Sequence, residues 1–120
     1  MSSPRHQVDI FVLRYVPNIL EEKFVEIGVL LCPVDDAGYA ACRFLDDWRR
    51  LRSVDAQADV AMVQSLVREI ERAWEQPFER AALVRRMLTS YSGGVQLFLA
   101  ETVVTDDPAK ELERLVRRFL

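Results

Sequence analysis

The stretch Arg14-Tyr-Val-Pro17, followed after a polar turn by Lys23-Phe-Val-Glu-Ile-Gly-Val-Leu-Leu-Cys32, decides the fold of this chain. It holds the densest run of β-branched and aromatic residues in the sequence, and such residues favour β-strands. Alternation of apolar and polar residues begins upstream, and Pro17 is expected to end it because proline lacks the ladder N–H. We therefore expect a first strand over residues 7–16 and a second over 23–33, paired as an antiparallel hairpin around a turn at 18–22.

The simplest register of this hairpin places two opposite charges across from each other. If Arg14 lies opposite Glu26, the pair stabilises the hairpin by a few tenths to about 1 kcal/mol. A slip by one residue would move these two charges to opposite faces of the sheet. The same register places Val16 opposite Phe24, Val12 opposite Gly28 and Ile10 opposite Leu30.

A second turn signal, Asp35-Asp-Ala-Gly38, predicts a third strand over residues 39–45. The three strands then form an antiparallel meander, in which Cys32 is expected opposite Cys42. Both faces of this sheet read as apolar, so we expect helices or another subunit to cover both. The residues assigned to one face are Ile10, Val12, Leu30 and Phe44, and those assigned to the other are Phe11, Leu13, Val25, Ile27, Val29 and Leu31.

The rest of the chain predicts helices and one further strand. A short capped helical turn is expected at 46–51, a long helix over 55–76 and a second helix over 78–88 with Leu83, Met87 and Leu88 inward. Residues 90–94 read as a flexible turn, and residues 95–104 read as a strand whose place in the sheet stays open. A C-terminal helix over 108–119 is marked by Asp107 as cap and by Pro108 at its first position. Apolar residues at helical spacing mark the face of each helix that is expected to pack on the core, and we call such a set an apolar stripe. The stripes are Val60, Val63, Val67, Ile70 and Trp74 in the long helix, and Leu112, Leu115, Val116 and Phe119 in the last one.

Length and composition bound the class of protein. The 120 residues suit a single α+β domain over 1–120, with residues 1–6 as a loose lead-in. A net charge of −3 disfavours a general attraction to nucleic acid, and no apolar run approaches the length of a membrane span. With no secretion signal at the N-terminus, we expect a cytoplasmic protein. A single histidine, His6, excludes a three-histidine zinc site within one chain.

Five charged residues are the candidate ligand-binding set: Arg14, Glu26, Arg43, Arg49 and Arg50. Arginines of this kind grip phosphates or carboxylates through paired N–H donors. The alternative is that Arg14 and Glu26 form a structural ion pair and that the other arginines form a solvated charged surface. The residues predict no catalytic group, metal site or cofactor. We therefore favour a non-enzymatic function, and enzymatic activity stays an open alternative.

Three smaller features carry a functional and a structural interpretation. Cys32 and Cys42 are either a redox switch or two small core residues. Ser92-Gly93-Gly94 resembles part of a phosphate-binding loop but lacks the accompanying lysine and the following helix, so we interpret it as a turn. The acidic pairs at 46–47 and 106–107 stand at helix starts, where capping explains them without a metal.

At residues 14–17 and 23–31 the chain resembles a bacterial family catalogued as domain of unknown function 3037. The resemblance extends through Asp46, Arg50-Leu51 and Thr105-Asp-Asp-Pro-Ala-Lys-Glu-Leu112 to the final helix, and members often carry Asn where this chain has Glu26. The family has no established activity. In gene context its members resemble small companions of kinase-like proteins of the persistence-toxin class, which implies such a protein as partner.

We therefore expect a non-catalytic protein-interaction or accessory module that binds a kinase-like neighbour or a second copy of itself. The alternative is an enzyme or binding domain for a phosphate-bearing ligand that uses the five charged residues. Convergence of these side chains in one concave pocket would favour the alternative, and their dispersal into solvent would disfavour it.

Overall fold

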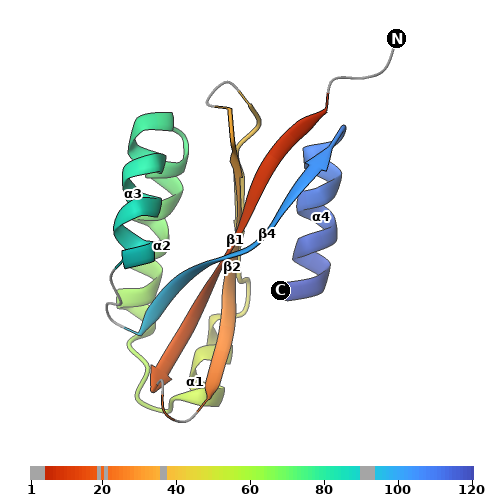
Figure 1. The fold of residues 1–120 in the computed structure, drawn as a ribbon. Helices are drawn as coiled ribbons and strands as arrows, with labels where there is room; N and C mark the ends of the chain where they lie inside the picture. Colours follow the sequence, from red (N-terminus) through yellow and green to blue (C-terminus); the bar gives the residue numbers. More distant parts are fainter. Residues whose placement is uncertain (1–4, 19, 21, 36–37, 90–93) are drawn as a thin grey trace.

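A four-stranded antiparallel sheet in the order β3-β2-β1-β4 lies at the centre of this α+β protein (Figure 1). The structure is a computed structural model, and it describes residues 5–18, 20, 22–35, 38–89 and 94–120. The strands are β1 (His6–Asn18), β2 (Lys23–Pro33), β3 (Ala41–Phe44) and β4 (Val95–Thr105). The helices are the 3-10 helix η2 (Trp48–Arg50), α1 (Leu51–Val54), α2 (Val60–Trp74), α3 (Pro77–Thr89) and α4 (Pro108–Phe119).

The predicted meander of the first three strands is confirmed, and β4 completes the sheet on the far side of β1. The first strand is longer than predicted, because it includes His6 and continues through Pro17 to Asn18. Pro17 is tolerated there because it lies in the register shift between Tyr15 and Asn18, where no regular ladder N–H is needed. The third strand is shorter than predicted and begins at Ala41.

The long helix starts later than predicted, at Val60. The Asp59 side chain caps it by accepting a hydrogen bond from the Met62 N–H at 3.0 Å. Asp55 instead forms a turn before the helix. Its side chain accepts a hydrogen bond from the Gln57 N–H at 3.0 Å, and its carbonyl accepts one from the Ala58 N–H at 3.1 Å. Aspartate side chains compete with helical bonding in this way, which periodicity alone does not reveal.

A β-bulge in β2 sets which residues face which side of the sheet. Arg14 lies opposite Glu26 as predicted, but Leu13 lies opposite Gly28, so Ile27 is the extra residue. Beyond the bulge the register differs from the predicted one, with Val12 opposite Val29. The predicted faces are therefore wrong for four residues: Leu30 and Phe44 join the side of Phe11 and Leu13, whereas Val29 and Leu31 join the side of Ile10.

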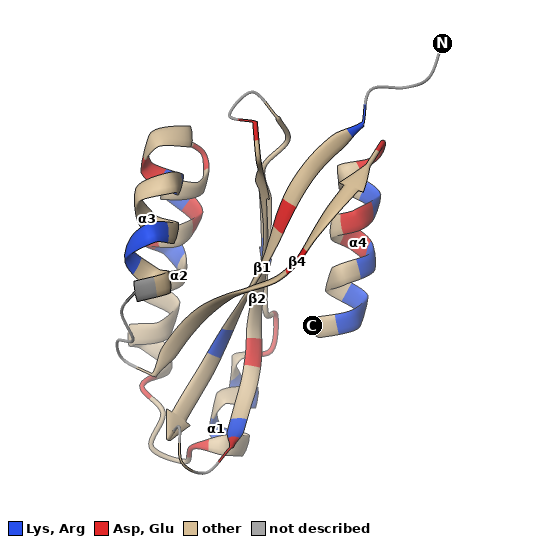
Figure 2. Cartoon of the chain, in the orientation of Figure 1, with Lys and Arg blue, Asp and Glu red and all other residues tan. Residues whose placement is uncertain are grey.

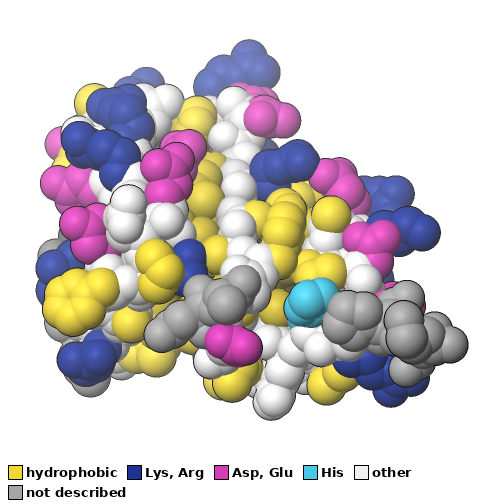
Figure 3. Space-filling view, turned by 90° about the horizontal axis from the view of Figure 1, so that it is seen from above, with side chains coloured by type: hydrophobic (Ala, Val, Ile, Leu, Met, Phe, Trp, Pro, Cys, Tyr) yellow, Lys and Arg dark blue, Asp and Glu magenta, His cyan; other side chains and the backbone are white. Residues whose placement is uncertain are grey.

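Helices α2 and α3 cover one face of the sheet, and α4 covers part of the other (Figure 1). The predicted stripe of α2 is confirmed, with Val63, Val67, Ile70 and Trp74 buried. On α3 Leu83 is buried as expected, but Leu88 is 48% exposed and does not point inward. Figure 2 shows most of the charge on the helices, while the strands carry few charged residues. Viewed from above, hydrophobic side chains occupy the middle and charged side chains the two flanks (Figure 3).

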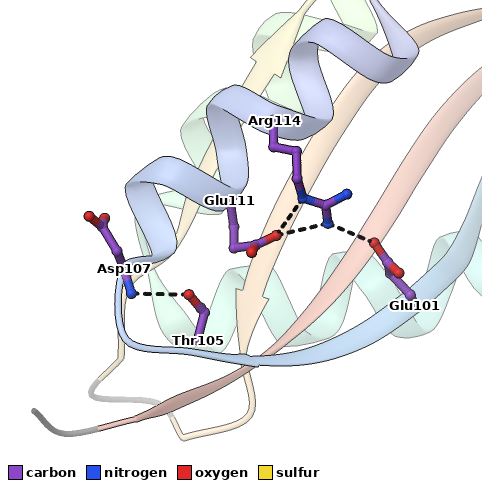
Figure 4. A network of polar contacts seen from close by, with 5 residues as sticks. All are labelled: Glu101, Thr105, Asp107, Glu111 and Arg114. Atoms are coloured by element: carbon purple, nitrogen blue, oxygen red, sulfur yellow. Dashed lines mark hydrogen bonds and ion pairs between the residues drawn. The ribbon is translucent and has the colours of Figure 1, made fainter.

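Polar contacts join α4 to β4. Arg114 donates from Nε and Nη2 to Glu111 at 3.0 and 2.8 Å, and from Nη2 to Glu101 of β4 at 3.2 Å (Figure 4). The Thr105 hydroxyl accepts from the Asp107 N–H at 3.0 Å, and Asp107 caps the helix through Lys110 N–H. The two carboxylates raise the pKa of the Arg114 guanidinium above its ordinary value. The hydrogen bond to Glu111 makes the largest contribution to this rise.

The Asp35–Gly38 turn forms as predicted, whereas the two cysteines do not pair. Gly38 N–H donates to the Asp35 carbonyl at 2.9 Å, as the predicted turn requires, while residues 36–37 lie outside the described part of the chain. Cys42 lies opposite Leu30, so the predicted pairing with Cys32 is wrong. Of the predicted 90–94 turn only Gly94 is described, with a left-handed φ of +79°. Among the described residues, no helix has the length and apolar character needed to cross a membrane.

Candidate functional site

The guanidinium of Arg14 lies between two phenylalanine rings on the face of the sheet that α4 partly covers. Its central carbon is 4.1 Å from the ring centroid of Phe24 in β2 and 4.1 Å from that of Phe98 in β4. Both distances are well within the range of cation–π attraction, which is worth about 0.5–2 kcal/mol per ring depending on burial. We call these three side chains the Phe–Arg–Phe layer.

Glu26 supplies the opposite charge to this layer. Arg14 Nη2 donates to Glu26 Oε1 at 3.3 Å, and the two side chains are 29% and 19% exposed. The Nε of Arg14 is buried and finds no hydrogen-bond partner among the described residues. The guanidinium is thus held mainly by ring stacking and by one carboxylate, and its remaining donors are not all used.

Backbone register explains why these residues meet. Arg14 and Glu26 are direct cross-strand partners, and Phe24 lies two positions before Glu26, so both point to one face. Phe98 pairs with Val12 from the other side of β1 and therefore shares that face. Sequence reasoning found Arg14 and Glu26 but missed both rings. The alternation of Phe24 with Glu26 could have indicated the first, whereas Phe98 depends on where β4 joins the sheet.

No described helix covers the hairpin end of this face. The residues buried under α4 are Ile10, Val29 and Leu31, which lie farther along the strands. The Phe–Arg–Phe layer itself shields the strands beneath it, since Val12 is fully buried and Val16 is 8% exposed. Its outer side remains accessible, with Phe24 43% exposed. This end of the face is therefore covered by side chains lying flat rather than by a packed helix.

The other three candidate arginines lie elsewhere. Arg43 pairs with Glu113 of α4 at 2.6 Å, and Arg50 donates to the Leu120 carbonyl at 3.2 Å. Arg43 and Arg50 line one depression of about 230 Å³ between β3, η2 and the end of α4, together with Asp46 and Asp47. Arg49 binds the Asp47 carboxylate and its side chain is 91% exposed. The structure thus brings Arg14 to Glu26 and Arg43 to Arg50 without gathering the five side chains around a single ligand.

Asp47 serves as a cap. Its carboxylate accepts from the backbone N–H of Arg49 at 3.2 Å and from Arg49 Nε at 2.8 Å. These bonds lower the pKa of Asp47, chiefly through the side chain of Arg49, and raise the pKa of Arg49. Asp47 and Asp107 thus play the capping role predicted for them. Within the described ranges, no three His, Cys, Asp or Glu side chains cluster as metal ligands do.

Cys42 lies on the core side of β3 in an environment that disfavours its thiolate. Burial raises the pKa of Cys42 to about 11, and the charges of Glu71 on α2 and of Glu75 just after it add to this rise. Neither Cys32 nor Cys42 is part of a disulfide, and both pack against the α2–α3 side of the core. Since Cys42 lies opposite Leu30, the two cysteines are diagonal neighbours, typically about 7–8 Å apart. A disulfide rarely spans such a distance without backbone movement.

Comparison with known proteins identifies a family without identifying an activity. No curated protein and no solved structure matches the chain significantly. A family model described as "Protein of unknown function (DUF3037)" matches residues 11–120, which include β1 from Phe11 onward, the other three strands and α1 to α4. The match covers the hairpin, the Phe–Arg–Phe layer and the final helix together, and this chain therefore belongs to the DUF3037 family.

Proposed function

We propose that this protein is a non-catalytic interaction module that binds a partner protein through the Phe–Arg–Phe layer. The observation that carries the proposal is the exposed outer side of this layer on a sheet face that α4 covers only in part. Aromatic and arginine side chains are enriched at the centres of protein interfaces and provide much of their binding energy. Here Phe24, Arg14 and Phe98 form one continuous surface of that composition.

Contacts within the layer also order the Arg14 side chain before any partner binds. Ring stacking on both sides and the bond to Glu26 fix the Arg14 side chain, which otherwise has many rotamers. Immobilising such a side chain on binding costs about 0.5–1.5 kcal/mol. Because the fold has already ordered it, a partner gains the contact without that cost. A non-catalytic role is supported by the ion pairs that engage Arg14, Arg43 and Arg49.

The partner we propose is the kinase-like neighbour implied by the family resemblance, with an apolar surface edged by a carboxylate. Apolar atoms would cover the ring of Phe24, and the carboxylate would accept from a terminal N–H of the Arg14 guanidinium that Glu26 does not engage. Such a partner would convert a half-exposed face into the buried centre of an interface.

Isothermal calorimetry with the purified kinase-like neighbour tests this proposal. Phe24→Ala should weaken binding at least tenfold, which corresponds to about 1.4 kcal/mol. Phe78→Ala is the matched control, since Phe78 is 86% exposed on α3, which packs on the opposite face. A chain that forms no complex with the neighbour, or equal binding by the two variants, would overturn the proposal.

A phosphate-bearing ligand is the second candidate, favoured by the shared position of Arg43 and Arg50 in one depression. Inorganic phosphate and nucleotides should then raise the melting temperature of the wild type but not of Arg50→Gln. Arg49→Gln is the control, because Arg49 projects into solvent. The absence of any shift in the wild type would exclude this candidate.

A further inference from the structure

The outer edge of β4 is the longest open sheet edge in the described part of the chain. β4 pairs with β1 over residues 95–105, and no described strand pairs with its other side. The opposite edge strand, β3, has only 4 residues, which is a common way of limiting unwanted pairing. The backbone N–H and C=O groups along the edge of β4 can be matched fully only by another strand.

β4 carries few of the devices that keep edge strands apart, and these begin only at Ala100. Residues 95–105 contain no lysine, arginine or proline, and Glu101 is their single charge. Arg114 of α4 binds the Glu101 carboxylate at 3.2 Å, which offsets that charge. The one irregularity is a bulge at Ala100, because Ile10 pairs with Glu101 and Phe11 with Leu99. A regular pairing surface therefore extends over residues 95–99.

Two exposed leucines lie beside this surface on the same face of the sheet. Leu99 of β4 pairs with Phe11, which faces α2 and α3, and Leu99 is 50% exposed. Leu88 in the last turn of α3 is 48% exposed. It follows Val84 by four positions on the same side of α3, and Val84 packs against the core cluster that contains Val95 and Leu97. Leu88 therefore lies near the start of β4, because α3 packs against this strand. Leu99 lies near the end of the regular segment 95–99. Figure 1 shows the end of α3 close to the start of β4.

We propose that two copies of this chain associate through their β4 strands, antiparallel about Leu97, into one eight-stranded sheet. In this register Leu97 faces its own copy, Gln96 faces Phe98, and Val95 faces Leu99 of the other copy. Leu99 of each copy then packs against Leu88 of the other. This contact occurs twice, as a two-fold interface requires.

A second copy fits this edge better than an unrelated strand because the edge is self-complementary. Residues 95–99 carry no charge, so no like charges meet across the axis. Val95 and Leu99 are equally far from Leu97 in the sequence. One register therefore places Leu99 of each copy opposite Val95, and next to Leu88, of the other copy. The dimer goes beyond the proposed partner binding, which does not depend on it. It would bring the two Phe–Arg–Phe layers side by side, since Phe98 belongs to both surfaces.

Light scattering behind a sizing column, over a wide range of protein concentration, tests the dimer. The wild type should have twice the chain mass of 13.9 kDa. Leu99→Asp and Leu88→Lys should each raise the dimer dissociation constant at least tenfold, because each places a charge against an apolar side chain of the other copy. The combined Leu88→Lys/Leu99→Asp variant should restore the dimer, since opposite charges then meet at both contacts.

Val104→Asp is the matched control. Val104 is 60% exposed on the same strand but lies beyond the bulge, so this variant should remain a dimer. A monomeric wild type, a Val104→Asp monomer, or a folded double variant that stays monomeric would each overturn the proposal. Failure of the dimer is distinguishable from failure of partner binding, because Leu99→Asp should still bind the kinase-like neighbour whereas Phe24→Ala should still dimerise.

Discussion

Arg14 and Glu26 lie directly opposite each other across the β1–β2 ladder, one step before the bulge that shifts the rest of the strand. Their contact of 3.3 Å joins a guanidinium stacked between two rings to a carboxylate that is 19% exposed. An ion pair shielded to this extent depends on both partners, because removal of one leaves the other charge poorly solvated.

A double-mutant cycle measures the coupling in this pair. Glu26→Ala should lower the free energy of unfolding by about 1–2 kcal/mol, since the partly buried guanidinium loses the carboxylate that it contacts among the described residues. Arg14→Met keeps an apolar chain between the rings, and in that background Glu26→Ala should cost about 1 kcal/mol less. Urea unfolding of the four proteins gives these values. Strict additivity of the two changes would contradict the coupling.

Gly28 is required by the close approach of Phe44 and Leu13 next to the bulge in β2. A Cβ atom at this position would lie 2.8 Å from Phe44 Cδ1 and 3.3 Å from Leu13 Cβ. Gly28→Ala should therefore lower the free energy of unfolding by about 1–3 kcal/mol through overpacking. Thermal unfolding checks this, and Gly28→Ala in a Phe44→Leu background should cost less because the blocking ring is gone. Equal costs in the two backgrounds would argue against the steric cause.

Arg80 is a buried charge that joins α3 to the end of α2. It is 5% exposed, and its Nη1 donates to the Trp74 carbonyl at 2.7 Å. Arg80→Met should lower the free energy of unfolding by about 1–3 kcal/mol, because a carbonyl at the helix end loses its donor. Arg72→Met on the exposed side of α2 is the control and should change it by less than about 0.5 kcal/mol. Chemical denaturation with matched m-values measures the difference.

Cys42 should behave as a protonated core residue rather than as a redox switch. With its pKa raised to about 11, its thiolate fraction at pH 8 is about a hundredfold below that of an ordinary cysteine. In a Cys32→Ser background, a thiol reagent should label the native protein correspondingly more slowly than the urea-unfolded protein. Equal rates would show that the thiol is accessible and reactive.

The same group predicts a dependence of stability on pH. The pKa of Cys42 is higher in the folded state, so the protonated thiol stabilises the fold fully below about pH 9, and this contribution is lost as the pH rises toward 11. Relative to Cys42→Ala, the wild type should therefore lose unfolding free energy between pH 9 and 11. Parallel stability curves for the two proteins in that window would contradict the shift.

Local signals in the sequence anticipated much of the fold and half of the candidate site. The hydrogen bond between Gly38 and Asp35, the cap at Asp107 and the apolar stripes of α2 and α4 join residues a few positions apart, and each is found as predicted. The pairing of Arg14 with Glu26 followed from hairpin geometry, which is also local. The start of the long helix was missed because the side chain of Asp55 competes for backbone groups.

Contacts distant in sequence were decided only by the tertiary structure. The bulge at Ile27 lies beside Gly28, against which the ring of Phe44 packs, and it reversed the facing of Val29, Leu30 and Leu31. No local pattern indicates that β4 joins β1, yet this pairing supplies Phe98 to the layer and creates the open edge. The sequence by itself determined where strands and helices form, because those preferences arise from neighbouring residues. The tertiary structure decided which faces meet and which remain open, because that depends on how side chains from distant segments fill a shared space.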